Sequence, residues 1–292
     1  MARRVFSSSG PTPARSRSLL RELAGSLSAL AFPSECSVCK QELTSPSFTG
    51  VCQACWDALE TWRGPACAVC GTPFTADLGA SATQPLCFQC AQGEFAFDSA
   101  RSLGLYRGVL RALILQLKFH RRERLGERLG ARLAEVWDSL GAACAGGRPL
   151  LVPVPLHGSR ERERGFNQSA LLAEGLSRAL ARTRGGAGFE ARALLRTKAT
   201  PPQTGLSLAA RRDNVRGAFS VAEPERVRDR VVVLIDDVMT TGSTLSACAE
   251  ALKAAGAERV LALTLARATP QFPDRQAPQG LTISAGGADN GS

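Results

Sequence analysis

The run from residue 231 to residue 245, VVVLIDDVMTTGSTL, constrains the fold of this chain more than any other segment. It begins with five branched apolar residues, which is typical of a strand buried on both faces of a parallel sheet. Two carboxylates, Asp236 and Asp237, follow where this strand is expected to end. A small hydroxyl-rich turn then leads into a helix expected over residues 243–255, closed by Gly256 as its C-cap.

The order of residues in this run also predicts a ligand. Ligands of open parallel sheets bind at the carboxyl ends of the strands. A helix N-terminus at that edge attracts a phosphate through its unpaired N–H groups and its dipole. The carboxylates of Asp236 and Asp237 suit the neighbouring hydroxyls of a ribose, or a bound Mg²⁺. A phosphorylated ribose is therefore the expected ligand.

Other proteins also place acidic residues after a hydrophobic strand. A Walker B strand needs a Walker A loop, and no lysine of this chain follows a glycine. A receiver domain needs an acidic residue and a lysine further downstream, where only Asp274 and Asp289 remain. A phosphatase of the DxDx(T/V) type needs an aspartate at Val238. An ordinary buried strand followed by a capped helix explains the turn but not the paired carboxylates.

The same run closely resembles the phosphoribosyl pyrophosphate (PRPP) signature of type I phosphoribosyltransferases. In that family the acidic pair, here Asp236 and Asp237, holds the ribose hydroxyls in the catalytic site. The resemblance implies a PRPP ligand bound with Mg²⁺. It assigns the 5′-phosphate to a loop of five residues: Thr240, Thr241, Gly242, Ser243 and Thr244.

Eight of the ten cysteines form four CxxC pairs. Two CxxC turns together supply the four thiolates of a structural Zn²⁺ site, so the pairs predict one or two zinc ions. The spacing leaves sequential and crossed pairing of the turns open. A disulfide framework disagrees with a reducing compartment, whereas an iron–sulfur cluster stays an alternative. The expected metal ligands are Cys36, Cys39, Cys52, Cys55, Cys67, Cys70, Cys87 and Cys90.

Composition and charge limit the class of protein. A chain of 292 residues, 44% of them hydrophobic, can bury one full α/β domain and a smaller module. The formal net charge of +10 favours phosphate-rich partners, although a GC-rich genome alone would also raise the arginine content. No apolar run reaches the roughly 20 residues of a spanning helix. We expect a cytoplasmic protein without a membrane span.

The order of elements predicts the fold class. Residues 1–17 read as a disordered N-terminus, 18–93 as a helix (18–32) plus a double zinc-finger module, and 269–292 as a disordered tail. The domain expected over residues 94–268 has strands at 95–106, 150–154 and 259–266 around the signature strand. Helices are expected at 109–118, 124–140 and 167–182. Strands that alternate with helices predict a doubly wound parallel sheet.

Three further segments narrow the resemblance. They are YRGVLRALILQLKF from residue 106, VPVPLHGSRERERGFNQ from residue 152, and LRTKATPPQTGLSLAARRDNVRGAF from residue 195. Together with the CxxC pairs and the PRPP signature, in this order, they resemble the ComF family of competence-associated proteins over about residues 18–267. The resemblance implies a type I phosphoribosyltransferase-like fold and a role in natural transformation. It also implies single-stranded DNA and proteins of the uptake machinery, such as a helicase-like factor, as partners.

Two basic segments are candidates for binding pyrophosphate. Arg160 and Arg164 are expected in a loop after the strand at residues 150–154, where forked guanidinium groups suit phosphates. Arg211 and Arg216 flank a stretch whose position resembles the flexible loop that closes over PRPP in type I enzymes. A solvated charged loop and an exposed β-hairpin are the structural alternatives for these two segments.

Three functions follow from these expectations. The first is a PRPP-binding protein of the DNA-uptake apparatus whose zinc module and basic loops contact single-stranded DNA. The second is a catalytically active phosphoribosyltransferase, in which Mg²⁺ and arginines stabilise the departing pyrophosphate. The third is a zinc-dependent DNA-binding protein with a vestigial phosphoribosyl site, which the intact acidic pair argues against.

Overall fold

The structure is a computed structural model that describes residues 35–43, 47–74, 85–119, 123–141, 148–198, 215 and 217–269. The predicted helix over residues 18–32, the predicted disordered N-terminus and the predicted tail beyond its first residue lie outside the described residues. Within the described residues, none of the helices has the length and apolar character of a membrane span.

The α-helices are α2 (Gln53–Asp57), α3 (Phe88–Ala91), α4 (Gly108–Phe119), α5 (Glu123–Arg132), α6 (Gly158–Arg164), α7 (Gln168–Thr183) and α9 (Ser243–Ala254). The strands are β1 (Ser99–Leu105), β2 (Leu150–Pro153), β3 (Gly188–Phe189), β4 (Leu194–Arg196), β5 (Phe219–Val221), β6 (Val231–Met239) and β7 (Arg259–Arg267). Short 3₁₀ turns are η1 (Leu133–Glu135), η2 (Trp137–Leu140) and η4 (Pro224–Arg226).

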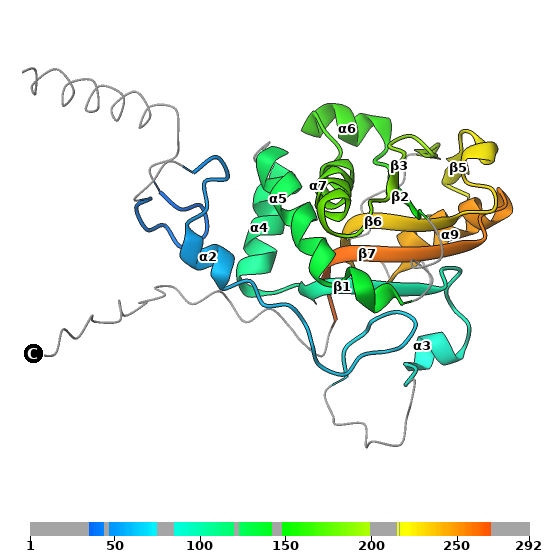
Figure 1. Cartoon of the computed structure of the whole chain (residues 1–292), viewed down its shortest axis with the longest axis horizontal. Helices are drawn as coiled ribbons and strands as arrows, with labels where there is room; N and C mark the ends of the chain where they lie inside the picture. Colours follow the sequence, from blue (N-terminus) through cyan, green and yellow to red (C-terminus); the bar gives the residue numbers. More distant parts are fainter. Residues whose placement is uncertain are drawn as a thin grey trace, which may run out of the picture.

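A five-stranded sheet forms the centre of the molecule, in the order β1-β7-β6-β2-β3 (Figure 1). All of its strand pairs are parallel. The strand β6 lies in the middle and continues to Met239, because β7 runs beside it and pairs Asp236 with Thr264 and Met239 with Arg267. The prediction that this strand ends before the two carboxylates is therefore wrong.

The sheet has a hydrophobic core on each face. Successive residues of β6 point to opposite sides, so Val233 and Ile235 join one core while Val232 and Leu234 join the other. The first core contains apolar residues of α4, α5 and α7, and the second contains those of α9. Helices on both faces of a parallel sheet confirm the predicted doubly wound α/β fold.

The helices α5 and α7 pack unusually close together. A Cβ atom added at Gly130 would lie 2.1 Å from the carbonyl oxygen of Leu172, and one at Gly175 would lie 2.0 Å from that of Glu127. The glycines thus let the two backbones touch. The predicted helix over residues 124–140 is shorter than expected, because its second half forms η1 and η2.

The predicted basic loop after β2 is also wrong, since residues 158–164 form the helix α6. The imidazole of His157 accepts a hydrogen bond from the Ser159 N–H and so caps its start. Gly165, with a φ of 82°, ends the helix in the left-handed conformation. The sequence between these two caps is polar, so apolar periodicity does not predict this helix.

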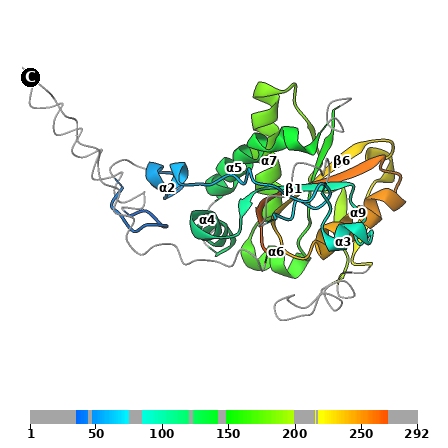
Figure 2. The same ribbon diagram turned by 90° about the horizontal axis from the view of Figure 1, so that it is seen from below.

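The cysteine-rich segment divides into two parts that pack at different places (Figures 1 and 2). The first part, with α2, packs into the core on the face of α4, α5 and α7. The second part, with α3, packs into the core on the face of α9 and hydrogen-bonds to the edge strand β1. That bond joins the Ala100 N–H to the carbonyl oxygen of Val69, at 2.7 Å.

Candidate ligand site and cysteine clusters

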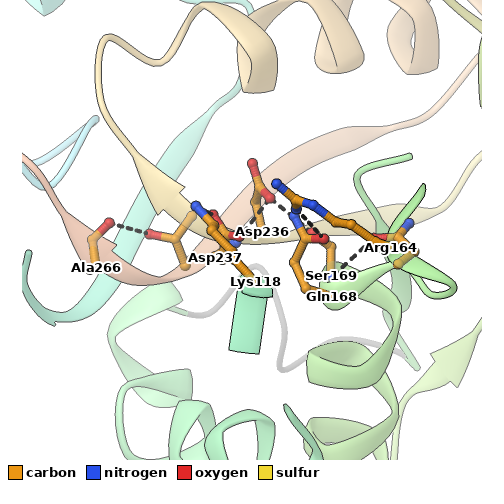
Figure 3. Close-up of polar contacts among 9 residues, drawn as sticks. Lys118, Arg164, Gln168, Ser169, Asp236, Asp237 and Ala266 are labelled. Atoms are coloured by element: carbon orange, nitrogen blue, oxygen red, sulfur yellow. Dashed lines mark hydrogen bonds and ion pairs between the residues drawn. The ribbon is translucent and has the colours of Figure 1, made fainter. Parts of the chain in front are cut away.

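The two carboxylates of β6 lie at the carboxyl end of the sheet and have different partners (Figure 3). Asp236 Oδ1 accepts hydrogen bonds from the Ser169 hydroxyl and from the Asp237 N–H, each at 2.9 Å. Asp237 is 4% exposed, and its Oδ1 lies 3.0 Å from the Lys118 ammonium. Its Oδ2 is buried without a hydrogen-bond partner among the described residues. A buried carboxylate oxygen without a hydrogen-bond partner can accept a hydrogen bond from a ligand hydroxyl or bind a cation.

The environment of the pair favours a proton on Asp236. Burial, and then the negative charge of Asp237, raise the pKa of Asp236 to about 7. The hydrogen bond from Ser169 and the positive charge of Lys118 act in the opposite direction. A carboxyl group whose pKa is raised toward 7 by burial and by a second carboxylate is common at functional sites.

The loop after β6 has the form of an anion site. Gly242 adopts a φ of 81° and caps α9 without a side chain, while the Ser243 N–H donates to the Thr241 hydroxyl at 3.4 Å. The hydroxyls of Thr241 and Ser243 lie 2.9 Å apart, while Thr240 is exposed. A β-carbon at Gly242 would lie 2.8 Å from both Met239 and Phe95. Glycine is therefore required here for two reasons, its φ and the close approach of Phe95.

Two arginines, Arg164 and Arg196, lie near the carboxylates, and a third, Arg160, lies near Arg196. Arg164 donates to Gln168 at 3.0 Å, and Figure 3 shows its side chain extending toward Asp236. Burial and the positive charge of Arg160 lower the pKa of Arg196, while the charge of Asp236 raises it. Arg196 thus lies within electrostatic reach of both Arg160 and Asp236. The other two predicted arginines, Arg211 and Arg216, lie outside the described residues.

Three residues of the site escaped the sequence reasoning. Lys118 stands near the end of the apolar helix α4, where it reads as a solvated end of that helix. Ser169 sits in the first turn of α7 and reads as part of the cap. Arg267 is the last residue of the apolar strand β7, and its buried guanidinium donates to the Thr240 carbonyl oxygen at 2.7 Å. The sequence signal that could have indicated Arg267 is a lone arginine at the end of an apolar strand.

The cysteines form two separate clusters, which we call the first cluster (Cys36, Cys39, Cys52 and Cys55) and the second cluster (Cys67, Cys70, Cys87 and Cys90). The sequential grouping is the one that occurs. Within each cluster the four Sγ atoms lie within 4.8 Å of one another. Measured Sγ–Sγ distances are 3.7 Å for Cys39 and Cys52 and 3.5 Å for Cys70 and Cys87. Four sulfurs at about 2.3 Å around a tetrahedral ion are about 3.8 Å apart, so the donor atoms fit Zn²⁺.

A groove of about 1020 Å³ lies between the first cluster and the helices α5 and α7. Four of its lining residues are arginines: Arg124, Arg128, Arg178 and Arg182. Arg178 is paired with Glu127 and Glu174, but within the described parts of the chain the other three form no ion pair. We call this feature the arginine groove.

Aromatic rings accompany two of these arginines. The Arg124 guanidinium lies 4.2 Å from the centre of the Phe48 ring, and that of Arg128 lies 4.0 Å from the Trp56 ring. Phe48 is 62% exposed and lines the groove. The groove thus places one of its cations against an exposed aromatic ring.

Comparisons with known proteins agree with both halves of the chain. A family model described as a double zinc ribbon domain matches residues 27–92, and one described as a phosphoribosyl transferase domain matches residues 168–282. The DNA utilization protein YhgH of Escherichia coli O157:H7 is 34% identical, over 82% of this chain and 99% of that protein. Competence protein F of Haemophilus influenzae is 33% identical, over 75% of this chain and 91% of that protein. Competence protein ComFC of Bacillus subtilis is 27% identical, over 44% of this chain and 52% of that protein.

Proposed function

Because this chain belongs to the ComF family of competence-associated proteins, we propose that it binds PRPP with Mg²⁺ and handles single-stranded DNA. The binding of PRPP is assigned to the carboxyl end of β6, and that of DNA to the arginine groove. The two ligands would then bind to different parts of the molecule.

The observation that carries the PRPP proposal is the unsatisfied carboxylate of Asp237 beside the glycine-capped N-terminus of α9. The loop N–H groups and the hydroxyls of Thr241 and Ser243 suit a 5′-phosphate. The vacant oxygen of Asp237 and the neighbouring carboxyl group of Asp236 suit two ribose hydroxyls or a hydrated Mg²⁺. Arg160, Arg164 and Arg196 supply positive charge for the pyrophosphate.

Calorimetric titration of Mg²⁺ and PRPP into the zinc-loaded protein tests this assignment. We expect micromolar binding that is lost in the Asp236→Asn/Asp237→Asn double variant. The Glu250→Gln variant, which removes an exposed carboxylate from α9, is the matched control and should bind normally. If the folded wild-type protein does not bind PRPP, the proposal is wrong.

The DNA proposal is supported by the chemistry of the arginine groove. Guanidinium groups without a carboxylate partner attract backbone phosphates, and an exposed ring offers a face on which a base can stack. The groove combines both, through Arg124, Arg128 and Arg182 with Phe48. The names of the relatives refer to DNA utilization and competence, which agrees with this partner. Proteins of the uptake machinery, such as a helicase-like factor, belong to the same proposal.

Fluorescence anisotropy with a labelled oligothymidine measures DNA binding directly. We expect an affinity that falls steeply as salt increases, because phosphate contacts release counterions. The Phe48→Leu variant should bind more weakly at every salt concentration and keep the same salt dependence, since stacking releases no ions. Equal affinity at low and physiological salt would exclude the groove as a phosphate-binding surface.

Catalytic transfer is a second candidate, favoured by the arginines next to the acidic pair. In that reaction a nucleophile attacks the anomeric carbon of the ribose. The bond to the pyrophosphate oxygen breaks, and the pyrophosphate leaves with the electron pair. Arg160 and Arg164 would neutralise its charge. An assay of pyrophosphate release with nucleobases and DNA ends as acceptors separates transfer from binding alone.

A further inference from the structure

Arg267 is a buried cation without a carboxylate partner. Its residue is 4% exposed, and it forms no ion pair with an acidic side chain in the described ranges. A buried charge is costly unless hydrogen bonds and an opposite charge compensate it. The surroundings of Arg267 must therefore supply both.

The guanidinium connects the phosphate loop with the second cluster. Its Nη1 donates to the carbonyl oxygen of Thr240, the first residue of the loop, at 2.7 Å. Its Nη2 donates to the Thr72 hydroxyl, also at 2.7 Å. The same hydroxyl lies 3.0 Å from the Cys70 Sγ. One side chain thus joins the loop to a residue that touches a cysteine of the second cluster.

The charge that faces Arg267 is that of the same cluster. Burial lowers the pKa of Arg267, and the negative charge of the ionised sulfurs of Cys70, Cys87, Cys90 and Cys67 acts in the opposite direction. Four thiolates around a divalent ion carry a net negative charge. A metal-loaded second cluster therefore provides the anion that a buried Arg267 requires.

A second contact joins the same two regions. Phe95, which follows the last cysteine of the second cluster, packs against Gly242 in the phosphate loop. The next residue, Ala96, donates its N–H to the Ser246 hydroxyl of α9 at 3.0 Å. Among the described residues, no hydrogen bond joins the first cluster to the phosphate loop, and its cysteines belong to the core on the other face of the sheet.

We propose that Arg267 is a positioning residue through which the second cluster fixes the phosphate loop. The second cluster is then part of the construction of the PRPP site, and the first cluster is not. The proposal rests on the proposed binding of PRPP. It predicts that a change at Thr72, which touches no ligand, alters the loop.

The Thr72→Val variant tests this connection because it keeps the side-chain shape and removes the hydroxyl. Gln41 occupies the equivalent position beside the first cluster, since its carbonyl accepts from Cys36 N–H at 2.8 Å, as that of Thr72 accepts from Cys67 N–H. The Gln41→Leu variant is therefore the matched control. We expect PRPP affinity about tenfold weaker in Thr72→Val and unchanged in Gln41→Leu, from the loss of one charge-assisted hydrogen bond.

Hydrogen exchange of the amides of residues 240–244 gives a readout that needs no ligand. We expect faster exchange in Thr72→Val than in the wild type or in Gln41→Leu. Elemental analysis should show that all three proteins still bind two zinc ions. The Arg267→Lys variant should show the same loosening, because an ammonium keeps the charge but not the fork that reaches both partners.

The two possible failures are distinguishable. A wild-type protein that does not bind PRPP removes the proposed function, while the exchange measurement still tests the connection. If the wild type binds PRPP and Thr72→Val matches Gln41→Leu in both affinity and exchange, the role of Arg267 is wrong.

Discussion

The turns that carry the two cysteine clusters have nearly the same backbone but different surroundings. Lys40 and Gly71 occupy equivalent positions, with φ values of 64° and 65°. Each donates its N–H to the carbonyl of the first cysteine, at 2.9 Å for Lys40 and 3.0 Å for Gly71. In the first cluster this position is exposed, whereas a Cβ at Gly71 would lie 2.8 Å from the carbonyl oxygen of Ala100 on β1.

The difference shows how one metal-binding design can serve two purposes. The first cluster stands beside the arginine groove, which Cys52 helps to line. The second cluster lies against the sheet edge and reaches the phosphate loop through Arg267. Under the proposed function the two clusters would support different ligands, although their sequences read alike.

Loss of a cluster should have the largest effect on stability. Each of Cys39→Ser and Cys70→Ser is expected to lower the zinc content from two to one and to reduce the free energy of unfolding by several kcal/mol. The loss should be greater for Cys70→Ser, because it also leaves the charge of Arg267 without its anion. Elemental analysis and urea unfolding measure both effects. Equal losses in the two variants would contradict the special place of the second cluster.

Exchange of the residue types at the two turns should come next. Gly71→Ala is expected to cost about 1–3 kcal/mol of unfolding free energy, since both its φ and the Ala100 carbonyl oppose a side chain. Lys40→Gly should leave the free energy unchanged or raise it by less than about 1 kcal/mol. Chemical denaturation followed by far-ultraviolet circular dichroism provides both values. A tolerated Gly71→Ala would mean that the second cluster is not held against β1.

The two ligands should differ in their dependence on pH. Asp236, with its pKa raised to about 7 by burial and by the charge of Asp237, must lose its proton before it can hold a cation. PRPP affinity should therefore fall about tenfold between pH 8 and pH 6. DNA affinity should stay constant over this range, since no histidine is among the described residues that line the arginine groove. Calorimetry and anisotropy at both pH values provide the comparison.

The same shift has a consequence for stability. The folded state holds the Asp236 proton more tightly than an ordinary aspartate of pKa 3.8, so the free energy of unfolding falls as the pH rises from about 4 to 7. Asp236→Asn should remove this decline and be more stable than the wild type at pH 8. A less stable Asn variant at pH 8 would show that the ionised carboxylate is well compensated.

The smallest effect is expected for the arginine groove. The double variant Arg124→Gln/Arg182→Gln should weaken oligothymidine binding about fivefold and reduce the salt slope by about 1.4, at roughly 0.7 for each phosphate contact. PRPP affinity should not change. Arg259→Gln, an exposed arginine at the amino end of β7, is the control. An unchanged salt dependence in the double variant would show that DNA binds to another part of the molecule.

The sequence predicted the fold well where periodicity was strong. The apolar run of β6 and the regular helix α7 required no tertiary information. The end of β6 was misplaced, because only pairing with β7 shows that the strand continues through the carboxylates. The helix α6 was missed, since it is stabilised by its caps and not by an apolar face.

The site was predicted as a set of segments but not as a network. The acidic pair and the loop lie in one continuous run, so their proximity was evident. Lys118, Ser169 and Arg267 come from three other elements, and only the topology of the sheet brings them to this edge. The contact between Thr72 and Arg267 joins positions so distant in the chain that no local pattern indicates it.

The most direct test of the division between the clusters is a pair of titrations on two variants. Mg²⁺ with PRPP and then oligothymidine are titrated into folded Cys39→Ser and Cys70→Ser, each checked for one remaining zinc ion. We predict that Cys70→Ser loses PRPP binding and keeps DNA binding, while Cys39→Ser keeps PRPP binding and loses DNA affinity. If both variants lose the same ligand to the same extent, the clusters do not divide the two functions.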